Sequence, residues 1–347
     1  NSFPWSRDSG AIYYVAGSSV RDYLMRQDLA SGRIERVTDR VASPPSFTAD
    51  LSRAVFLKAN PSHPAEVTLL EGSKESKLTN IADGVARFPT VQSKPVTWKS
   101  RDGLAIEGML YLPFRYQPGQ RVPLLVSLHG GPTGVVLDSF PEPRTYPTQV
   151  FLEKGFAILA PNFRGSVNYG EKFRLKIIES QGFGDFDDVM SGVDYLIEQG
   201  IADSTRLGVM GWSYGGFLTA WAIGHTDRFK ASSVGAPATD WTSYYGQSDG
   251  PRITMMTYFG GTPWEKPEVY SRHSPRSGIA NIRTPTLLQV GALDINHNSE
   301  IYWSLTDRKI PVEYVVYPRE GHGIAEPAHQ RDLMERNLRW FSQWLLP

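Results

Sequence analysis

The sequence predicts an α/β fold built on a doubly wound, mostly parallel sheet, with a small all-β module in front of it. Three observations lead to this prediction. Short apolar or β-branched runs alternate with helical patterns between residues 91 and 347. One of these runs leads through a glycine-flanked serine into a helical pattern. Residues 1–90 follow a different pattern of short strand-like runs that repeat at a spacing of 42 residues.

The repeat in residues 1–90 predicts two blades of the β-propeller type. The segment 4–8 and the strand-like run 12–15 are echoed by the segment 46–50 and the run 54–57. Short strands at such a period are typical of propeller blades. A closed propeller has about four to eight blades. With only two blades, we expect the chain to be either truncated or an unusually reduced relative of proteins that carry a whole propeller. A generic antiparallel module is the alternative.

Two blades alone would leave strand edges and an apolar face uncovered, and such edges pair readily with other chains. The side chains that would then face water are Trp5, Tyr13, Tyr14, Phe47, Val55 and Phe56. We therefore expect residues 1–90 either to pack onto the following domain or to self-associate, with a homodimer as the simplest closed form.

Residues 91–347 contain the alternation expected of a parallel sheet. The runs typical of buried strands are 124–128, 156–160, 207–210, 231–234, 286–290 and 312–317. Helical patterns cover 186–199, 217–223, 299–306 and 330–346. Such an order favours a doubly wound sheet covered by helices on both faces.

The stretch 211–216, Gly-Trp-Ser-Tyr-Gly-Gly, carries the strongest functional signal. It lies between the strand-like run 207–210 and the helical run 217–223, which is the context of a nucleophile elbow. The turn is so tight that a side chain on either side of the serine would clash, hence the glycines. Ser213 is therefore the candidate nucleophile.

A serine hydroxyl needs a base to take its proton, and His322 is the best candidate. It follows the strand-like run 312–317 and has glycine on both sides. His225 ends a helical pattern and His273 lies in a polar loop, whereas His329 is expected on the surface of the last helix.

The acid that orients the histidine should lie between the two in the chain, after a strand. Asp294 follows the run 286–290 and is the candidate. Asp240 competes with it but follows Gly235-Ala236-Pro237, a loop better suited to the wall of a pocket. Taken alone, Asp294 would be interpreted as a helix cap. Because it lies in the chain between the candidate serine and the candidate histidine, we interpret it as the acid.

Acyl transfer also requires donors for the oxyanion. The strand 124–128 ends at His129-Gly130-Gly131-Pro132, where glycines expose backbone N–H groups. The second donor is the N–H of Tyr214, the residue after the serine.

These motifs, in this order, resemble the catalytic domain of the prolyl oligopeptidase family of serine peptidases, which is an α/β-hydrolase. Within the family, they are most similar to the acylaminoacyl-peptidase and oligopeptidase branch. The likeness runs from about Val96 to Pro347. It rests on the segments 96–103, 129–132, 162–170, 211–216 and 321–323.

The resemblance implies a triad of Ser213, Asp294 and His322, with the backbone of Gly131 and Tyr214 as the oxyanion hole. It also implies that Trp241 and Tyr244 line the specificity pocket on the leaving side. The segment Ile295-Asn296-His297 departs from the Arg-Val-Pro that this branch usually carries, which affects the expected pocket wall.

Composition and charge exclude several classes of partner and site for this chain. The formal net charge is zero, so there is no electrostatic case for nucleic acid or for an anionic membrane, and no apolar run approaches the roughly 20 residues of a membrane span. The absence of cysteine excludes disulfides, thiol catalysis and zinc–thiolate sites. No cofactor or metal is expected, since the carboxylates of Asp185-Phe186-Asp187-Asp188 suit the first turn of a helix.

The predicted function is a serine hydrolase that cleaves short or N-acylated peptides through an acyl-enzyme. A carboxylesterase using the same triad is the alternative. A non-catalytic interaction protein is the third hypothesis. The chain begins at Asn1, so its numbering is expected to start inside a longer protein, and a soluble cytoplasmic protein is the first expectation for its location.

Overall fold

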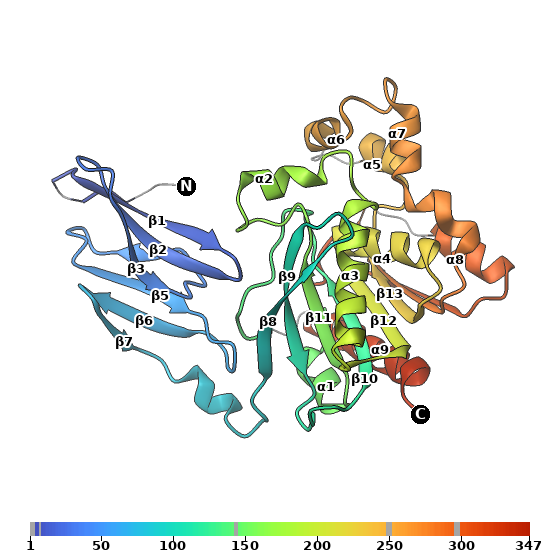
Figure 1. The fold of residues 1–347 in the computed structure, drawn as a ribbon, viewed down its shortest axis with the longest axis horizontal. Coiled ribbons are helices and arrows are strands. Elements are labelled where there is room, and N and C mark those ends of the chain that lie inside the picture. The colour runs from blue at the N-terminus through green and yellow to red at the C-terminus, as the bar shows by residue number, and fades with distance from the viewer. Residues whose placement is uncertain (1–3, 7, 142–144, 248–251, 295–298) are drawn as a thin grey trace.

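Three β-sheets organise the chain, as seen in Figure 1. The computed structural model describes residues 4–6, 8–141, 145–247, 252–294 and 299–347. Two small antiparallel sheets come first, and an eight-stranded sheet follows. The small sheets are β1 (Ala11–Ser18), β2 (Arg21–Asp28) and β3 (Ile34–Asp39), then β4 (Ser46–Phe47), β5 (Arg53–Lys58), β6 (Glu66–Glu71) and β7 (Lys74–Lys77).

The large sheet has the order β15-β14-β13-β12-β10-β11-β9-β8. Neighbouring strands from β11 to β15 run parallel, while β8 and β9 are antiparallel additions at one edge. The strands are β8 (Gln92–Lys99), β9 (Ala105–Leu112), β10 (Val122–Leu128), β11 (Ala157–Asn162), β12 (Ala202–Trp212), β13 (Phe229–Gly235), β14 (Thr286–Gly291) and β15 (Val312–Tyr317). All six strands expected between residues 124 and 317 are therefore confirmed, and the mostly parallel sheet with them.

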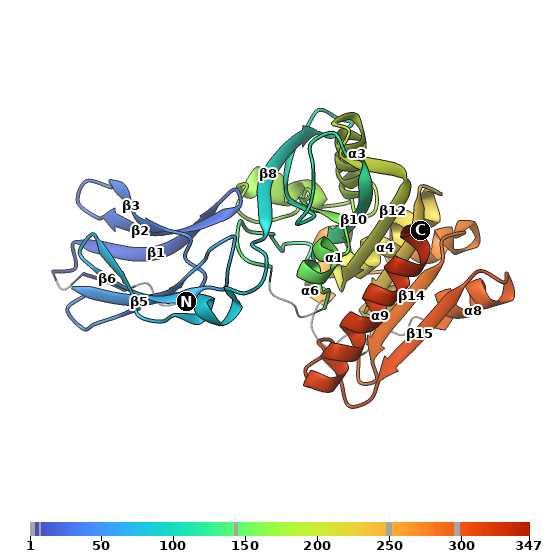
Figure 2. The same cartoon turned by 90° about the horizontal axis from the view of Figure 1, so that it is seen from below.

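Helices cover both faces of this sheet (Figures 1 and 2). α3 (Gly184–Glu198), α4 (Tyr214–His225) and α8 (Ser299–Asp307) contribute to one apolar core, and α1 (Thr148–Glu153) and α9 (Pro327–Leu345) contribute to the other. Within β10, Leu124 and Val126 belong to the first core, and Leu125 belongs to the second. Because successive side chains of a strand alternate between faces, a strand that is buried on both sides must be apolar throughout.

Several short helices were not predicted. They are α1, α2 (Glu171–Arg174), α5 (Trp241–Gln247), α6 (Arg252–Phe259), α7 (Pro267–Arg272) and the 3₁₀ segments η1 (Ile81–Val85), η2 (Leu175–Ile177) and η3 (Pro275–Asn281). One or two turns contain too few residues to establish a helical period. The helix expected at 217–223 begins three residues earlier, directly after Ser213.

The two small sheets pack against each other through a shared apolar cluster. Leu24 from one sheet and Phe56 from the other are both almost fully buried in it. The rings of Tyr13 and Phe47 approach to 5.3 Å across the same interface. Phe56, one of the side chains that uncovered blades would leave in water, is covered by this packing, whereas Trp5 is 58% exposed.

The small sheets also contact the large domain. Asp138, which follows β10, is 6% exposed and pairs with Arg21 at 3.1 Å and Arg40 at 2.8 Å. Asn168 donates to Asp22 at 2.9 Å, and Val20 is buried in a core of the large domain. The first of the two expected arrangements, packing of residues 1–90 onto the following domain, is present. Self-association stays a prediction.

Among the described residues, no helix combines the length and the apolar character needed to cross a bilayer.

Candidate active site

Four of the parallel strands deliver the candidate residues to one edge of the large sheet. β10 ends just before His129, β12 before Ser213, β14 before Asp294 and β15 before His322. The chain passes from β10 to β11 on one side and then returns to β12 on the other. Open α/β sheets bind ligands where the strand order reverses in this way, outside the carboxyl ends of the strands.

The turn at Ser213 is held in a strained backbone conformation. Its φ is 62° and its ψ is −123°, a combination that residues with a side chain rarely adopt. A Cβ on Gly211 would lie 2.3 Å from the carbonyl oxygen of Gly215, and one on Gly215 would lie 2.0 Å from that of Leu128. Both glycines are therefore required by close backbone approach, as the sequence predicted.

A chain of hydrogen bonds joins the three residues that the sequence singled out. His322 Nε2 lies 2.9 Å from Ser213 Oγ, and His322 Nδ1 lies 2.9 Å from Asp294 Oδ2. The Asp294 side chain is 2% exposed, while that of His322 is 50% exposed. With a proton on Nδ1, the imidazole donates to the buried carboxylate and presents Nε2 to the hydroxyl as an acceptor.

The competing candidates are engaged elsewhere. Asp240 accepts from the backbone N–H groups of Thr242 and Ser243 at the start of α5, and its other oxygen pairs with Arg276 at 2.5 Å. It is therefore a helix cap, and it is not among the described residues that line the cavity beside Ser213. His273 is buried and lies 2.7 Å from the carbonyl oxygen of Gln181.

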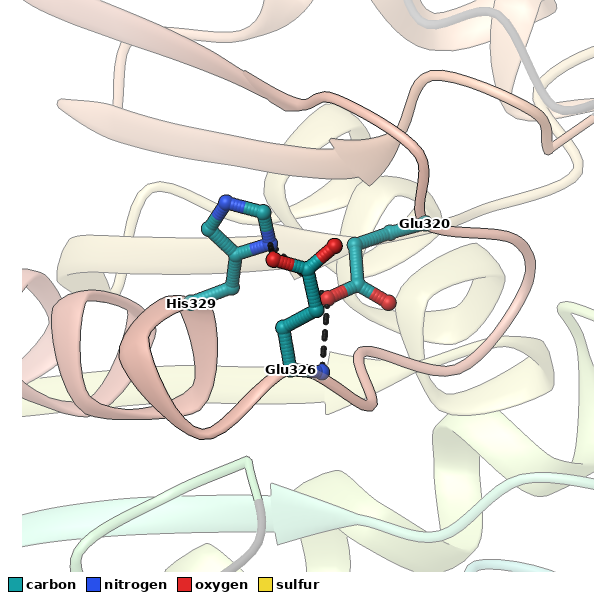
Figure 3. Close-up of side chains that lie close together, drawn as sticks. All are labelled: Glu320, Glu326 and His329. Atoms are coloured by element: carbon teal, nitrogen blue, oxygen red, sulfur yellow. Dashed lines mark hydrogen bonds and ion pairs between the residues drawn. The ribbon is translucent and has the colours of Figure 1, made fainter.

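The loop that carries His322 is braced by Trp212 and by Glu320, and Figure 3 shows Glu320 with Glu326 and His329. Trp212, next to Ser213, donates its indole N–H to the His322 carbonyl oxygen at 2.7 Å. The buried Glu320 carboxylate accepts from the backbone N–H groups of Ala325 and Glu326, each at 2.8 Å. The N–H of Ala325, followed by the contact with His329, holds the pKa of Glu320 below its usual range. The brace is therefore formed with an ionised Glu320.

His329 differs from the sequence expectation. It lies on the last helix, as expected, but its side chain is only 18% exposed and its Nδ1 is 2.8 Å from Glu320. Glu320, Glu326 and His329 bring possible metal-ligand atoms within 4.8 Å of one another. The carboxylate oxygens of Glu320 already accept backbone N–H groups, and the Glu326 carboxylate pairs with Arg319. The contacts of this cluster are those of a loop brace.

The two predicted oxyanion donors lie next to Ser213. Tyr214 is the first residue of α4, and the first N–H groups of a helix have no partner inside it. Gly131 lines the same cavity as Ser213. A Cβ on the preceding Gly130 would lie 3.4 Å from the Ser213 Cβ, so the loop after β10 passes directly over the serine.

His129 supports this loop. Its ring stacks on Phe163 with centroids 4.2 Å apart, and its Nε2 lies 2.9 Å from Ser166 Oγ. Burial lowers the pKa of His129 to about 4. It is therefore neutral at neutral pH and acts as packing for the glycine loop.

A cavity of about 70 Å³ opens beside Ser213. Trp241 and Tyr244, the two substrate-binding candidates, both line it. Trp241 is 4% exposed and also packs against Phe217 and Phe259, so it is a core residue and a cavity wall at once. Further lining residues that the sequence did not reveal are Gln181, Thr254, Met255, Tyr258 and Phe259.

Asp185 lies beneath the site in an unusual environment. Tyr214 Oη donates to it at 2.7 Å, and the carboxyl group is fully buried. Burial raises the pKa of Asp185 to about 7, and the negative charge of Asp188 adds to the effect. The first turn of a helix favours an anion, but burial outweighs the helix dipole here. The expected account of Asp185 as an ordinary first-turn carboxylate is therefore incomplete.

This burial makes stability depend on pH. The folded chain keeps a proton on Asp185 up to a pKa of about 7, while the unfolded chain loses it near pH 4. The free energy of unfolding should therefore fall as pH rises between these values, by about 4 kcal/mol. Over the part of this range between pH 5 and pH 8, we expect Asp185→Asn to gain about 3 kcal/mol on the wild type in urea unfolding. Asp187→Asn, in the same turn, is the control; a variant that tracks the wild type at both pH values would contradict the assignment.

A scan of known families matches residues 144–347 to the model of the prolyl oligopeptidase family. A curated relative, an uncharacterized peptidase of Bacillus subtilis named YuxL, is 29% identical over 98% of this chain and 52% of its own length. The acylamino-acid-releasing enzyme of Arabidopsis thaliana is 32% identical over 65% of this chain and 31% of its own length.

Solved structures agree with these matches. The acylaminoacyl peptidase of Pyrococcus horikoshii has a TM-score of 0.85 and 28% identity over 97% of this chain and 55% of its own. The chain thus spans about half the length of the relatives it matches over nearly all its residues. The segment 295–297, where the sequence departs from the branch pattern, lies outside the described residues.

Proposed function

Because the chain belongs to the prolyl oligopeptidase family, we propose that it is a serine hydrolase that cleaves short or N-acylated peptides through an acyl-enzyme. In this proposal, residues 91–347 are the catalytic domain and residues 1–90 are a partial propeller. The names of two relatives, an acylamino-acid-releasing enzyme and an acylaminoacyl peptidase, support the acylated substrate.

The observation that carries the proposal is the pair of 2.9 Å contacts from His322 to Ser213 and to Asp294. Ser213 Oγ attacks the substrate carbonyl carbon while its proton passes to His322 Nε2. The carbonyl electron pair moves onto the oxygen, which accepts from the N–H groups of Gly131 and Tyr214. Asp294 keeps the proton on Nδ1 and stabilises the imidazolium.

The remaining steps release both products and return the proton to Ser213. The C–N bond breaks as His322 Nε2 gives its proton to the leaving amine, and an ester of Ser213 remains. A water molecule then gives its proton to His322 and attacks the ester, and the imidazolium reprotonates Ser213 as the acid leaves.

The cavity belongs to the acyl side of the substrate in this scheme. The leaving group must lie beside His322, because the imidazole protonates it. The described lining residues include Ser213, Gly131 and Tyr214 but not His322. We therefore assign Trp241 and Tyr244 to the acyl-side residue, whereas the sequence had suggested the leaving side.

Ester hydrolysis on the same residues is the second candidate, because the exposed His322 side chain leaves the nucleophile accessible. One assay compares a p-nitrophenyl ester, an acyl-alanyl anilide and an aminoacyl anilide. We expect the ester and the acyl anilide to be turned over and the aminoacyl anilide to be the poorest substrate. Turnover of the ester alone would leave a carboxylesterase. No turnover, and no labelling by an organophosphonate, would leave a non-catalytic interaction protein.

A further inference from the structure

Gln181 combines burial, a place on the cavity wall and the lack of a hydrogen-bond partner. We propose that it is a specificity residue that selects substrates whose acyl-side residue has a neutral, hydrogen-bonding side chain, a hydroxyl or a carboxamide. The inference rests on the proposed function, since it concerns the substrate of the same site.

The side-chain amide of Gln181 has unmet hydrogen-bonding capacity. The residue is 1% exposed, and neither Oε1 nor Nε2 has a partner among the described residues. Roughly nine in ten buried polar groups in proteins are paired, because an unpaired one costs about 1–3 kcal/mol. Both ends of one amide are unpaired here, which points to a group that arrives with a ligand.

The location of Gln181 identifies that ligand. It lines the cavity together with Ser213, Gly131 and Tyr214. Of the described lining residues, Gln181 alone has buried side-chain atoms without a partner. A side chain that enters from the acyl carbon bound to Ser213 therefore meets aromatic walls and the residue that carries this unpaired amide.

The backbone of Gln181 is fixed by its neighbours. Its carbonyl oxygen lies 2.7 Å from Nδ1 of the buried His273. The next residue, Gly182, has a φ of +82°, and a Cβ there would lie 2.6 Å from the Trp221 ring. These contacts keep the residue at its place on the cavity wall.

The charge of the cavity wall restricts the substrate further. The described lining residues include no aspartate, glutamate, lysine or arginine. A charged side chain would be desolvated there without a counter-charge, which is strongly unfavourable. An apolar side chain would fit but would leave the amide unpaired. Neutral polar side chains satisfy both conditions.

Pairs of substrates with matched shapes test this. We would measure kcat/KM for N-acyl p-nitrophenyl esters and anilides of threonine and valine, and of asparagine, leucine and aspartate. The wild type is expected to prefer threonine to valine and asparagine to leucine about tenfold, with aspartate the poorest. Gln181→Met keeps the length and removes the hydrogen bonds. It should lower kcat/KM for the polar members about 10- to 100-fold and change that of the apolar members less than threefold.

Folding and catalysis are controlled separately. Gln181→Met removes a buried unpaired amide, so its melting temperature should equal or exceed that of the wild type. Gln181→Leu is the second variant, which also lacks hydrogen-bonding atoms and should lose the polar preference as well. Binding of N-acyl asparagine amide and N-acyl leucine amide to the Ser213→Ala protein, measured by calorimetry, tests selectivity without turnover.

The outcomes separate the two proposals. If neither esters nor anilides are hydrolysed, the proposed function fails, while tighter binding of the asparagine amide still supports the role of Gln181. If hydrolysis occurs but Gln181→Met lowers kcat/KM equally for both members of each pair, the inference is overturned. A wild-type preference for valine and leucine would overturn it too.

Discussion

Replacing Ser213 by alanine is expected to lower kcat by about 10⁴ to 10⁶. The substitution removes the atom that forms the bond to the substrate, and the strained elbow and the helix behind it remain in place. The remaining rate comes from the oxyanion donors and from substrate binding. Labelling by an organophosphonate, read by mass spectrometry, should be stoichiometric on Ser213 in the wild type and absent in the variant.

The matched control is Ser204→Ala, the same substitution at an exposed position of β12, the strand that leads to Ser213. It should keep the wild-type rate and the adduct. An adduct on a serine other than Ser213 would contradict the nucleophile assignment, as would a Ser213→Ala protein that keeps its activity.

Asp294→Asn should lower kcat by about 10⁴ with a modest change in KM. The amide can donate to Nδ1, which favours the tautomer with the proton on Nε2. His322 would then donate to Ser213 Oγ across their 2.9 Å contact and could not accept its proton. Steady-state kinetics on the acyl-alanyl anilide measures both constants.

Asp240→Asn is the control for this variant. Asp240 caps α5 and pairs with Arg276, and α5 carries the cavity residues Trp241 and Tyr244. Its loss should therefore change KM more than kcat. If the two variants exchanged these effects, Asp240 would be the acid and Asp294 a structural residue.

The sequence was most informative where a local pattern determines the structure. The strand runs are apolar because the large sheet is buried on both faces, and this makes them visible without any knowledge of their partners. The elbow is visible because Gly211 and Gly215 are required by backbone contacts inside one turn. The loops with Asp294 and His322 each follow a recognisable strand, so their meeting at one edge follows from the parallel order.

Features that depend on distant contacts were not visible. Gln181 precedes α3, and nothing in the neighbouring residues shows that its side chain lines a cavity with Tyr258 and Ser213. His329 was expected on the surface of the last helix, but its partner Glu320 lies on the loop that carries His322. In both cases burial is set by a segment that packs from elsewhere, which single-sequence periodicity does not record.

The salt bridges of Asp138 connect the two small sheets to the segment that follows β10. Asp138 holds Arg21 and Arg40 of the small sheets, and it lies nine residues after His129 in the segment that follows β10. The same segment begins with the glycines proposed to bind the oxyanion. Local unfolding proceeds in contiguous cooperative units. Detachment of the small sheets and fraying of the oxyanion loop are therefore coupled events, and amide hydrogens on the two sides of this junction should exchange with solvent in step.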